Sequence, residues 1–525
     1  MTQGVASAML TVLALLAALL SYAFIKTALF LALLSAMAFA IFYYCLSPVM
    51  KRTLGYRPII VALAMPLAAW GVPNIWALYA IMLGMVPLFA RRAAEVAPLY
   101  LFSLLLLPGL DTSMMLGGVK LFEFGVHDAL TVGALLRLLL FTDGKVEGFR
   151  PLDIPVLLVL LLLVTGLARD TTVTNFVRVL INIGLDYAVP YFVISRSVRT
   201  MDDVRLCMVW LACAAVIISV ILLYEVRTGW PMYNSLYDRH GIMTLLLVKM
   251  RGGVLRAGGP FLESTSMAMV LVFCFLAAWL SRPAFRSKLH YLAILLLLLV
   301  GLSAPQSRGA WIGLLIAFLV ADLYRGRIYL LLRRCVLVAL AGGILLTLAH
   351  NSSYISETMG LSGGSMDTVD YRERLFERGM EEFKESPIVG YSLPEAMIRL
   401  DDLRQGEGIV DFVNTYIFIA LISGVIGLII FTGGFAIFIG LLWMRLPLLR
   451  RSPADLAPAA LICGGLASMM EMLFFTSFGG RPAVFLFLFF GFSAAIYGMR
   501  GASRPMPTKL STAVPVTARP SQRGQ

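Results

Sequence analysis

Three arginines stand out because the segments around them are otherwise suited to lipid or to a membrane edge. Arg308 lies in LSAPQSRGAWIGLLIAF (302–318), where an apolar run begins. Arg256 precedes the turn GGP and a second apolar run, and Arg372 lies in a charged stretch between two others. An arginine inside hydrocarbon costs about 2.5–3.5 kcal/mol on insertion scales. We therefore expect all three at one membrane surface, where their guanidinium groups could bind a phosphate or diphosphate.

A reaction at such a site that removes a proton would also need a proton acceptor, and three carboxylates fall at predicted ends of apolar helices. These are Glu263, Asp411 and Glu471. Each could act as a general base, and a purely structural role for each stays open. We assign catalytic roles to Glu263, Arg308 and Arg372. The predicted ligands of the diphosphate are Arg256, Arg308 and Arg372.

The charged stretch around Arg372 is predicted to form a helix. It would run from Asp367, a candidate N-cap, to Ser386, and Pro387 would end it. Apolar residues recur in it at i, i+4 and i+7, on the face that also carries Arg372: Phe376, Met380 and Phe383. Either Arg372 snorkels at the edge of a surface helix, or it faces inward onto a cavity and meets an anion.

The elements that would position these residues are membrane helices. The chain has 525 residues, of which 60% are hydrophobic and 14% are charged, whereas ordinary soluble domains carry about 25% charged residues. The apolar runs are continuous, which favours helices over the alternating strands of a barrel. We predict an all-α, polytopic membrane bundle of about 12–16 transmembrane helices. The first apolar run, from Val5, is interpreted as a retained helix rather than a signal peptide.

The distribution of positive charge sets the expected topology. The formal net charge is +13, and basic residues cluster in short loops between apolar runs. The positive-inside rule places these loops in the cytoplasm and accounts for the charge without a nucleic-acid partner. We expect N-terminal transmembrane helices in 1–150, a transmembrane core in 151–500 with a large extracytoplasmic loop at 350–411, and a disordered cytoplasmic tail in 501–525. The three arginines then share the extracytoplasmic side.

Other chemistries have no support in the sequence. The six cysteines form no Cys-x-x-Cys pair, and the four histidines show no metal-ligand spacing. A glycine-rich phosphate loop after a strand is also lacking. We therefore predict chemistry without a metal or cofactor.

Four motifs together resemble the bacterial O-antigen ligase/polymerase superfamily. SRGAWIGLL is similar to its Ser-Arg-Gly helix start, and LRAGGPF is similar to its Arg-x-x-Gly turn. YRERLFERGMEEFKESPIVGYS is similar to its Arg-x-x-x-aromatic helix ending in Pro-x-x-Gly, and DFVNTYIFIALISGVIGLIIF to its Asn segment leading into Gly-x-x-Gly. The matching residues in the last two motifs are Arg372, Phe376, Pro387, Gly390, Asn414, Gly424 and Gly427. The resemblance covers roughly residues 150–500.

The resemblance implies a membrane glycosyltransferase that uses an undecaprenyl-diphosphate-linked glycan as donor and a second glycan as acceptor. Its arginines would neutralise the leaving diphosphate. The implied location is the bacterial inner membrane, among membrane lipid, with the site facing the periplasm. A chain-length regulator and a flippase are the implied protein partners. Candidate acceptor-site residues are Asn414, Tyr416 and Arg481.

The chain departs from the family pattern at three points. Val413 stands where the family's ligases carry a histidine before the asparagine, Ser392 replaces a glycine, and Ser264-Thr265 replaces a Pro-Asn pair. The first departure favours a polymerase of O-antigen or exopolysaccharide repeat units over a ligase. Ligation to a lipid A core or protein, a flippase or transporter, and a structural partner of an assembly complex are the alternatives.

Overall fold

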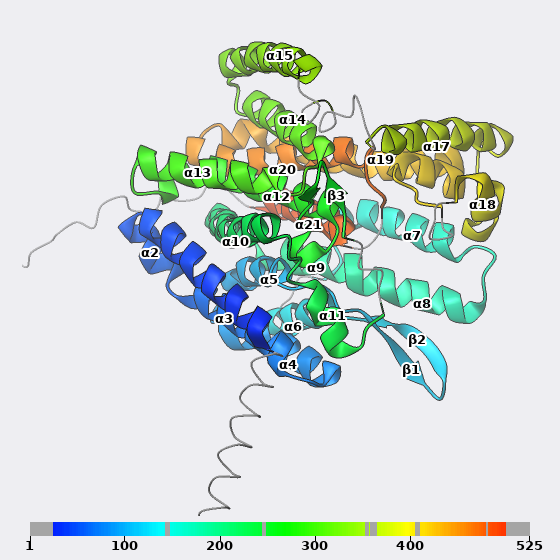
Figure 1. Ribbon diagram of the computed structural model, residues 1–525, viewed down its shortest axis with the longest axis horizontal. Helices are drawn as coiled ribbons and strands as arrows, with labels where there is room; N and C mark the ends of the chain where they lie inside the picture. Colours follow the sequence, from blue (N-terminus) through cyan, green and yellow to red (C-terminus); the bar gives the residue numbers. More distant parts are fainter. Residues whose placement is uncertain are drawn as a thin grey trace, which may run out of the picture.

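The computed structural model describes residues 25–141, 148–243, 248–351, 356, 365–404, 410–478 and 481–499. Most of these residues are helical, and the strands form two short hairpins (Figure 1). The predicted all-α class of polytopic membrane protein is therefore confirmed. The first apolar run up to residue 24 and the predicted tail 501–525 lie outside the described residues, and the domain boundaries stay predictions.

The elements follow one another from the N-terminus as a long series of helices. After a helix over Ile25–Cys45, the first half contains α2 (Pro48–Leu54), α3 (Arg57–Gly71), α4 (Ile75–Phe89), α5 (Val96–Leu104), β1 (Thr112–Leu116), β2 (Val119–Phe124), α6 (Val126–Phe141), α7 (Ile154–Ala168), α8 (Val173–Ile183), α9 (Val189–Ser197), α10 (Met201–Thr228), α11 (Asn234–His240), β3 (Met250–Arg251) and β4 (Val254–Leu255). The second half contains α12 (Ser264–Leu280), α13 (Lys288–Ser303), α14 (Arg308–Tyr324), α15 (Ile328–Asn351), α17 (Ser365–Glu385), α18 (Leu393–Arg399), α19 (Thr415–Leu449), α20 (Pro453–Met472) and α21 (Arg481–Gly498).

Membrane-crossing capacity differs among these helices. In the described residues, five are long and apolar enough to span a bilayer: Ile25–Cys45, Pro151–Ala168, Val173–Ser197, Met201–Thr228 and Thr415–Leu449. The bent pair α2–α3 would make a sixth, and five shorter apolar helices accompany them. The chain breaks at WGVPN, because α3 ends at Gly71 and α4 begins at Ile75. The expected count of about 12–16 crossings stays a prediction.

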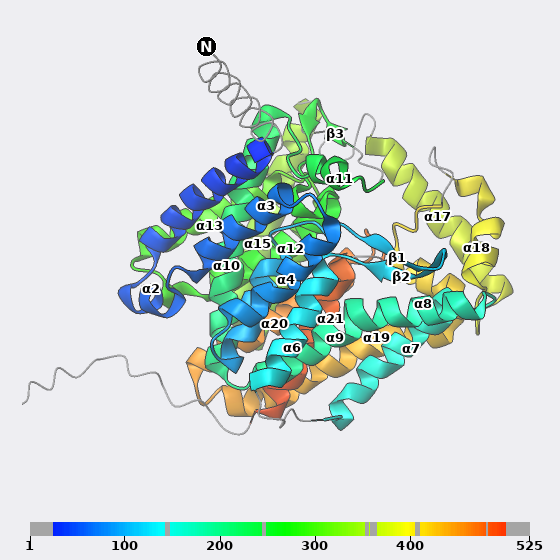
Figure 2. The same ribbon diagram turned by 90° about the horizontal axis from the view of Figure 1, so that it is seen from below.

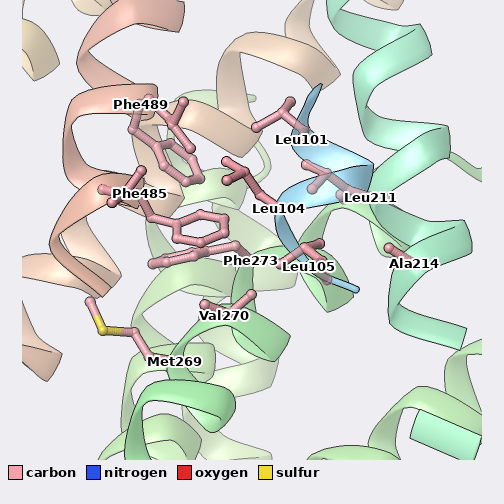
Figure 3. Packing of buried hydrophobic residues seen from close by; sticks show 14 of the residues in the cluster. Leu101, Leu104, Leu105, Leu211, Ala214, Met269, Val270, Phe273, Phe485 and Phe489 are labelled. Atoms are coloured by element: carbon pink, nitrogen blue, oxygen red, sulfur yellow. The ribbon is translucent and has the colours of Figure 1, made fainter. Parts of the chain in front are cut away.

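The centre of the bundle is packed by aliphatic and aromatic side chains from helices far apart in sequence. Figure 3 shows Leu101 and Leu104 of α5, Leu211 of α10, Phe273 of α12 and Phe485 of α21 meeting there. The Phe273 and Phe485 rings stack with their centroids 6.1 Å apart. Packing of this kind holds α12 rigidly, so the polar segment before α12 is held in a fixed place.

The two hairpins were not predicted. In the first, β1 pairs with β2 through the turn residues Gly117 and Gly118, which both have positive φ. A Gly-Gly pair between short strands is a known hairpin signal, but the apolar residues around it obscured the alternation. The second hairpin joins β3 to β4 through Gly252 and Gly253 and carries Arg251. Both hairpins lie outside the helical core.

The charged helix α17 and the short helix α18 lie together at one side of the bundle, next to α19 and α7, in both views (Figures 1 and 2). Their attachment depends on two glycines with positive φ, Gly390 and Gly424. A Cβ at Gly390 would lie 2.3 Å from the Leu421 carbonyl oxygen, and one at Gly424 would lie 2.2 Å from that of Ile388. The backbone N–H of Val425 also donates to Pro387 at 2.8 Å. The Pro-x-x-Gly turn therefore docks into a kink of α19.

Candidate active site

A cavity of about 1630 Å³ opens where the polar segments before α12 and α14 meet α17 and the ends of α19 and α20. All three motif arginines line it, although they come from three separate segments of the chain. Its charged lining residues are Lys249, Arg251, Arg256, Glu263, Arg308, Arg372, Glu373, Arg374, Asp402, Arg404, Asp411 and Glu471. The wall thus combines several cations with carboxylates, a composition suited to a charged, polar ligand.

Two of the arginines are tied to the turn that precedes α14. Nη1 of Arg251 donates to the carbonyl of Gln306 at 2.8 Å, and Nε of Arg256 donates to that of Pro305 at 3.3 Å. The backbone N–H of Ala257 also donates to Ala304 at 3.3 Å. These bonds bring the β3–β4 hairpin against the turn that carries Arg308. Arg251 was not among the predicted site residues.

Unusual backbone conformations occur at both turns. Leu262 has φ 60° and Gln306 has φ 52°, and neither residue is glycine. A left-handed conformation costs such residues roughly 1–3 kcal/mol and persists only where the surroundings impose it. Glu263 directly follows the first residue, and Arg308 lies two positions after the second. The strained turns therefore deliver charged side chains to the cavity wall.

Helix α17 presents Arg372 to the cavity, but its buried face differs from the predicted one. The buried side chains are Tyr371, Leu375 and Glu382, and a Cβ on Gly379 would meet Ile417 of α19 at 2.6 Å. The buried face of α17 is thus displaced by one residue, toward the N-terminus, from the predicted apolar face. Phe376, expected on the buried face, is 50% exposed and lines the cavity. The helix also begins at Ser365, so Asp367 lies inside it rather than at its cap.

The displacement has a clear cause and a consequence. Gly379 allows α17 to approach α19 closely, and the hydroxyl of Tyr371 donates to the Asp411 carbonyl at 3.0 Å. Rotation of the helix onto this face directs the next positions, Arg372 and Phe376, toward the cavity. Nη2 of Arg372 donates to the Phe475 carbonyl at 3.3 Å, and its guanidinium lies over the Phe475 ring. The inward interpretation of Arg372 is therefore the one that the structure supports.

The cations of the cavity influence one another. Burial, followed by the charge of Arg251, lowers the pKa of Arg256 to about 10, and Arg308 and Arg372 act in the same direction. Burial and Arg251 also lower the pKa of Arg372, although the carboxylates Asp411 and Glu263 oppose this. At neutral pH both guanidinium groups still carry their charge. Their mutual repulsion shows that the arginines lie close together in a partly dry place.

Glu263 has a structural task at the start of α12. Its two carboxylate oxygens accept from the backbone N–H groups of Thr265 at 2.9 Å and Ser266 at 2.5 Å, which makes it the N-cap. Burial alone would raise the pKa of Glu263, but these bonds and the charge of Lys249 outweigh it and hold the pKa below its usual value. A carboxylate engaged in this way is a weak base. Its predicted catalytic role stays a prediction.

The structure describes the side chains of two of the three candidate acceptor-site residues, and the acceptor role of all three stays a prediction. Asn414 lines the cavity and caps α19, since its side chain accepts from the N–H groups of Tyr416 and Ile417. Tyr416 lies behind the wall and donates to the Met470 carbonyl at 2.7 Å. Arg481 begins α21, and its side chain lies outside the description. Val413, which replaces the family's histidine, also lines the cavity and offers no proton acceptor.

The end of α20, where the sequence predicted only the candidate base Glu471, connects these parts. The carbonyl of Leu473 accepts from the N–H of Thr415 at 2.9 Å, which fixes the start of α19. A Cβ on Gly309, in the first turn of α14, would contact Phe475 at 3.4 Å. Helix α20 also packs along α14, where Gly464 lies close to the Ala317 carbonyl. This segment therefore joins the starts of α14 and α19 to Arg372, through bonds that no local motif encodes.

A family model described as O-antigen ligase matches residues 292–432. The predicted resemblance to the O-antigen ligase/polymerase superfamily is confirmed. The matched O-antigen ligase region contains Arg308, Arg372, Asn414 and the docked glycines, whereas Arg256 and Glu471 lie outside it. No curated protein matches the chain.

The O-antigen ligase match indicates a multi-pass membrane enzyme of glycosyl-transfer type that acts in O-antigen or polysaccharide assembly. In the described part of the chain, His, Cys, Asp and Glu side chains form no group of three that could hold a metal ion. The prediction of chemistry without a metal or cofactor is not tested by this finding and stays a prediction.

Proposed function

We propose that the protein is an inner-membrane glycosyltransferase that polymerises or transfers undecaprenyl-diphosphate-linked oligosaccharide repeat units in O-antigen or exopolysaccharide biosynthesis. The observation that carries the proposal is that Arg256, Arg308 and Arg372 line one cavity. Fixed guanidinium groups in a partly dry site favour a diphosphate, whose charge grows as it leaves. The cavity would face the periplasm, as the basic loops indicate.

The reaction would join an acceptor hydroxyl to the first carbon of the donor glycan. The bond from this carbon to the diphosphate oxygen breaks, and the electron pair leaves with the undecaprenyl diphosphate. The arginines bind the diphosphate and stabilise its developing charge. Phe376 and Phe475 also line the cavity, and their rings could stack on a sugar or cover the lipid end of the donor.

The proposal covers two reactions, polymerisation of repeat units and ligation of the glycan to a lipid A core. Polymerisation is favoured because Val413 replaces the histidine found in the family's ligases. Protein purified into lipid nanodiscs would be given undecaprenyl-diphosphate oligosaccharide of one defined length. We expect longer glycans on the same lipid, separated by gel electrophoresis and mass spectrometry. Glycan movement between leaflets without new bonds would instead show a flippase, and neither product would indicate a structural partner. Either of these results would overturn the proposal.

A further inference from the structure

Glu471 is a carboxylate in the cavity wall that the fold leaves without hydrogen bonds. It is the penultimate residue of α20 and lines the cavity. Both of its carboxylate oxygens are buried, and neither has a hydrogen-bond partner among the described residues. An ionised carboxylate can accept about four hydrogen bonds, and burial without them is costly. A native structure keeps such a group where function needs it.

Other carboxylates of the structure, unlike Glu471, form hydrogen bonds or ion pairs within the protein. Both oxygens of Glu263 cap α12, as described above, and Asp402 forms an ion pair with Arg378 at 3.3 Å. Glu225, also buried, accepts from the backbone N–H groups of Met232 and Gly259. These carboxylates hold backbone or neutralise a cation. Glu471 does neither with any described residue, so its hydrogen-bonding capacity is available to a ligand.

The position of Glu471 is fixed from both sides. The preceding carbonyl, of Met470, accepts from the Tyr416 hydroxyl, and the carbonyl of Leu473 accepts from Thr415. Four residues after Glu471, the Phe475 carbonyl accepts from Arg372. The carboxylate thus lies between the start of α19 and the arginine-lined part of the cavity.

We propose that Glu471 is the general base of the transfer reaction, an assignment that rests on the proposed function. The acceptor hydroxyl gives its proton to a Glu471 oxygen while its own oxygen forms the bond to the donor sugar carbon. The bond from that carbon to the diphosphate breaks, and the diphosphate takes the electron pair. The arginines stabilise the leaving group. The proton later passes from Glu471 to water, which regenerates the carboxylate.

The test compares transfer rates in nanodiscs with the defined undecaprenyl-diphosphate oligosaccharide. Because general base catalysis typically contributes about 10²–10⁴-fold, we expect Glu471→Gln to lower the rate by about that factor. The amide keeps the size of the side chain, so binding of radiolabelled donor should stay unchanged. The control Glu377→Gln, on the exposed side of α17, should retain the wild-type rate.

A second variant separates the chemical role from a structural one. Glu471→Ala leaves a space in the wall, and added formate should raise its rate in proportion to formate concentration, since formate supplies the missing carboxylate. Formate should not raise the rate of Glu471→Gln, in which the amide fills that space. An absence of formate rescue combined with loss of donor binding in both variants would show a structural role and overturn the assignment.

The remaining outcomes distinguish failure of the Glu471 assignment from failure of the proposed function. Wild-type transfer by Glu471→Gln, with Arg308→Ala inactive in the same assay, would overturn the base and leave the proposed function standing. An absence of elongation by the wild-type protein would overturn the proposed function and the base together.

Discussion

Two groups of arginines, one lining the cavity and one outside its lining, have opposite electrostatic surroundings. The outer arginines, which do not line the cavity, are Arg378 of α17 and Arg399 of α18. Arg378 pairs with Glu381 at 2.6 Å and with Asp402 of the cavity wall at 3.3 Å, and Arg399 pairs with three glutamates. Their carboxylate partners raise the pKa of both arginines. On the cavity side, burial and neighbouring cations lower the pKa of Arg372 and of Arg256.

The difference separates charges that serve the fold from charges available for a ligand. The outer arginines are neutralised by the protein itself, so they add no field beyond their immediate partners. The cavity arginines repel one another in a partly dry place, and that repulsion is relieved when an anion enters. A diphosphate carries enough negative charge to interact with several of them at once. The residue type is the same in both groups, and the electrostatic surroundings differ.

The largest expected effect is on the rate of transfer. Arg372→Ala should lower it by about 10²–10³-fold, the usual loss when one donor to a developing negative charge is removed. The matched control is Arg378→Ala, on the same helix but on the outer side, which should keep a rate near that of the wild type. Both rates would be measured in nanodiscs with defined donor. Equal losses in the two variants would contradict the division into two groups and point to loss of helix α17 packing instead.

A smaller effect is expected where the turn after α17 docks into α19, because this contact holds α17 with Arg372 and Arg378 in place. Gly390→Ala and Gly424→Ala each put a Cβ within 2.3 Å of a backbone carbonyl at a residue with positive φ. We expect each to lower the free energy of unfolding by about 1–3 kcal/mol. The thermal midpoint in nanodiscs measures this effect.

The control for the glycine variants is Gly433→Ala, also in α19. A Cβ there would have no neighbour within 4 Å, so this variant should be neutral or gain about 0.5–1 kcal/mol from helix propensity. A stable Gly390→Ala protein would mean that the turn docks in another way.

The sequence was sufficient to predict the class of fold and the convergence of Arg256, Arg308 and Arg372. Continuous apolar runs with basic loops specify a helical membrane protein, and the order of basic loops places polar turns on a common side. The helix around Arg372 was also predictable, since Pro387 ends it and its apolar residues follow a helical period. These features depend on local spacing, which a single sequence contains.

Features that depend on contacts between distant segments could not be predicted. The contact of Arg251 with Gln306 joins residues 55 positions apart, and the face of α17 that is buried depends on how closely Gly379 approaches α19. Glu263 caps α12 through hydrogen bonds to residues next to it in the chain. That the Glu471 oxygens lack hydrogen-bond partners among the described residues is visible only once the surrounding segments are placed. Among three carboxylates that looked equivalent in sequence, surroundings alone distinguish the cap from the candidate base.

The smallest effect concerns the outer ion pairs and tests whether they matter for the reaction at all. Glu395→Gln removes one partner of Arg399. In the wild type, Nε of Arg399 lies 3.1 Å from Oε1 of Glu395, whose side chain is 45% exposed. We expect an unchanged transfer rate and a slight fall in the thermal midpoint. At 1 M salt, where the Debye length is about 3 Å, the difference in midpoint should vanish because the remaining attraction is screened. A loss of rate comparable to that of Arg372→Ala would show that the outer charges reach the cavity, and the two groups of arginines would then form a single network.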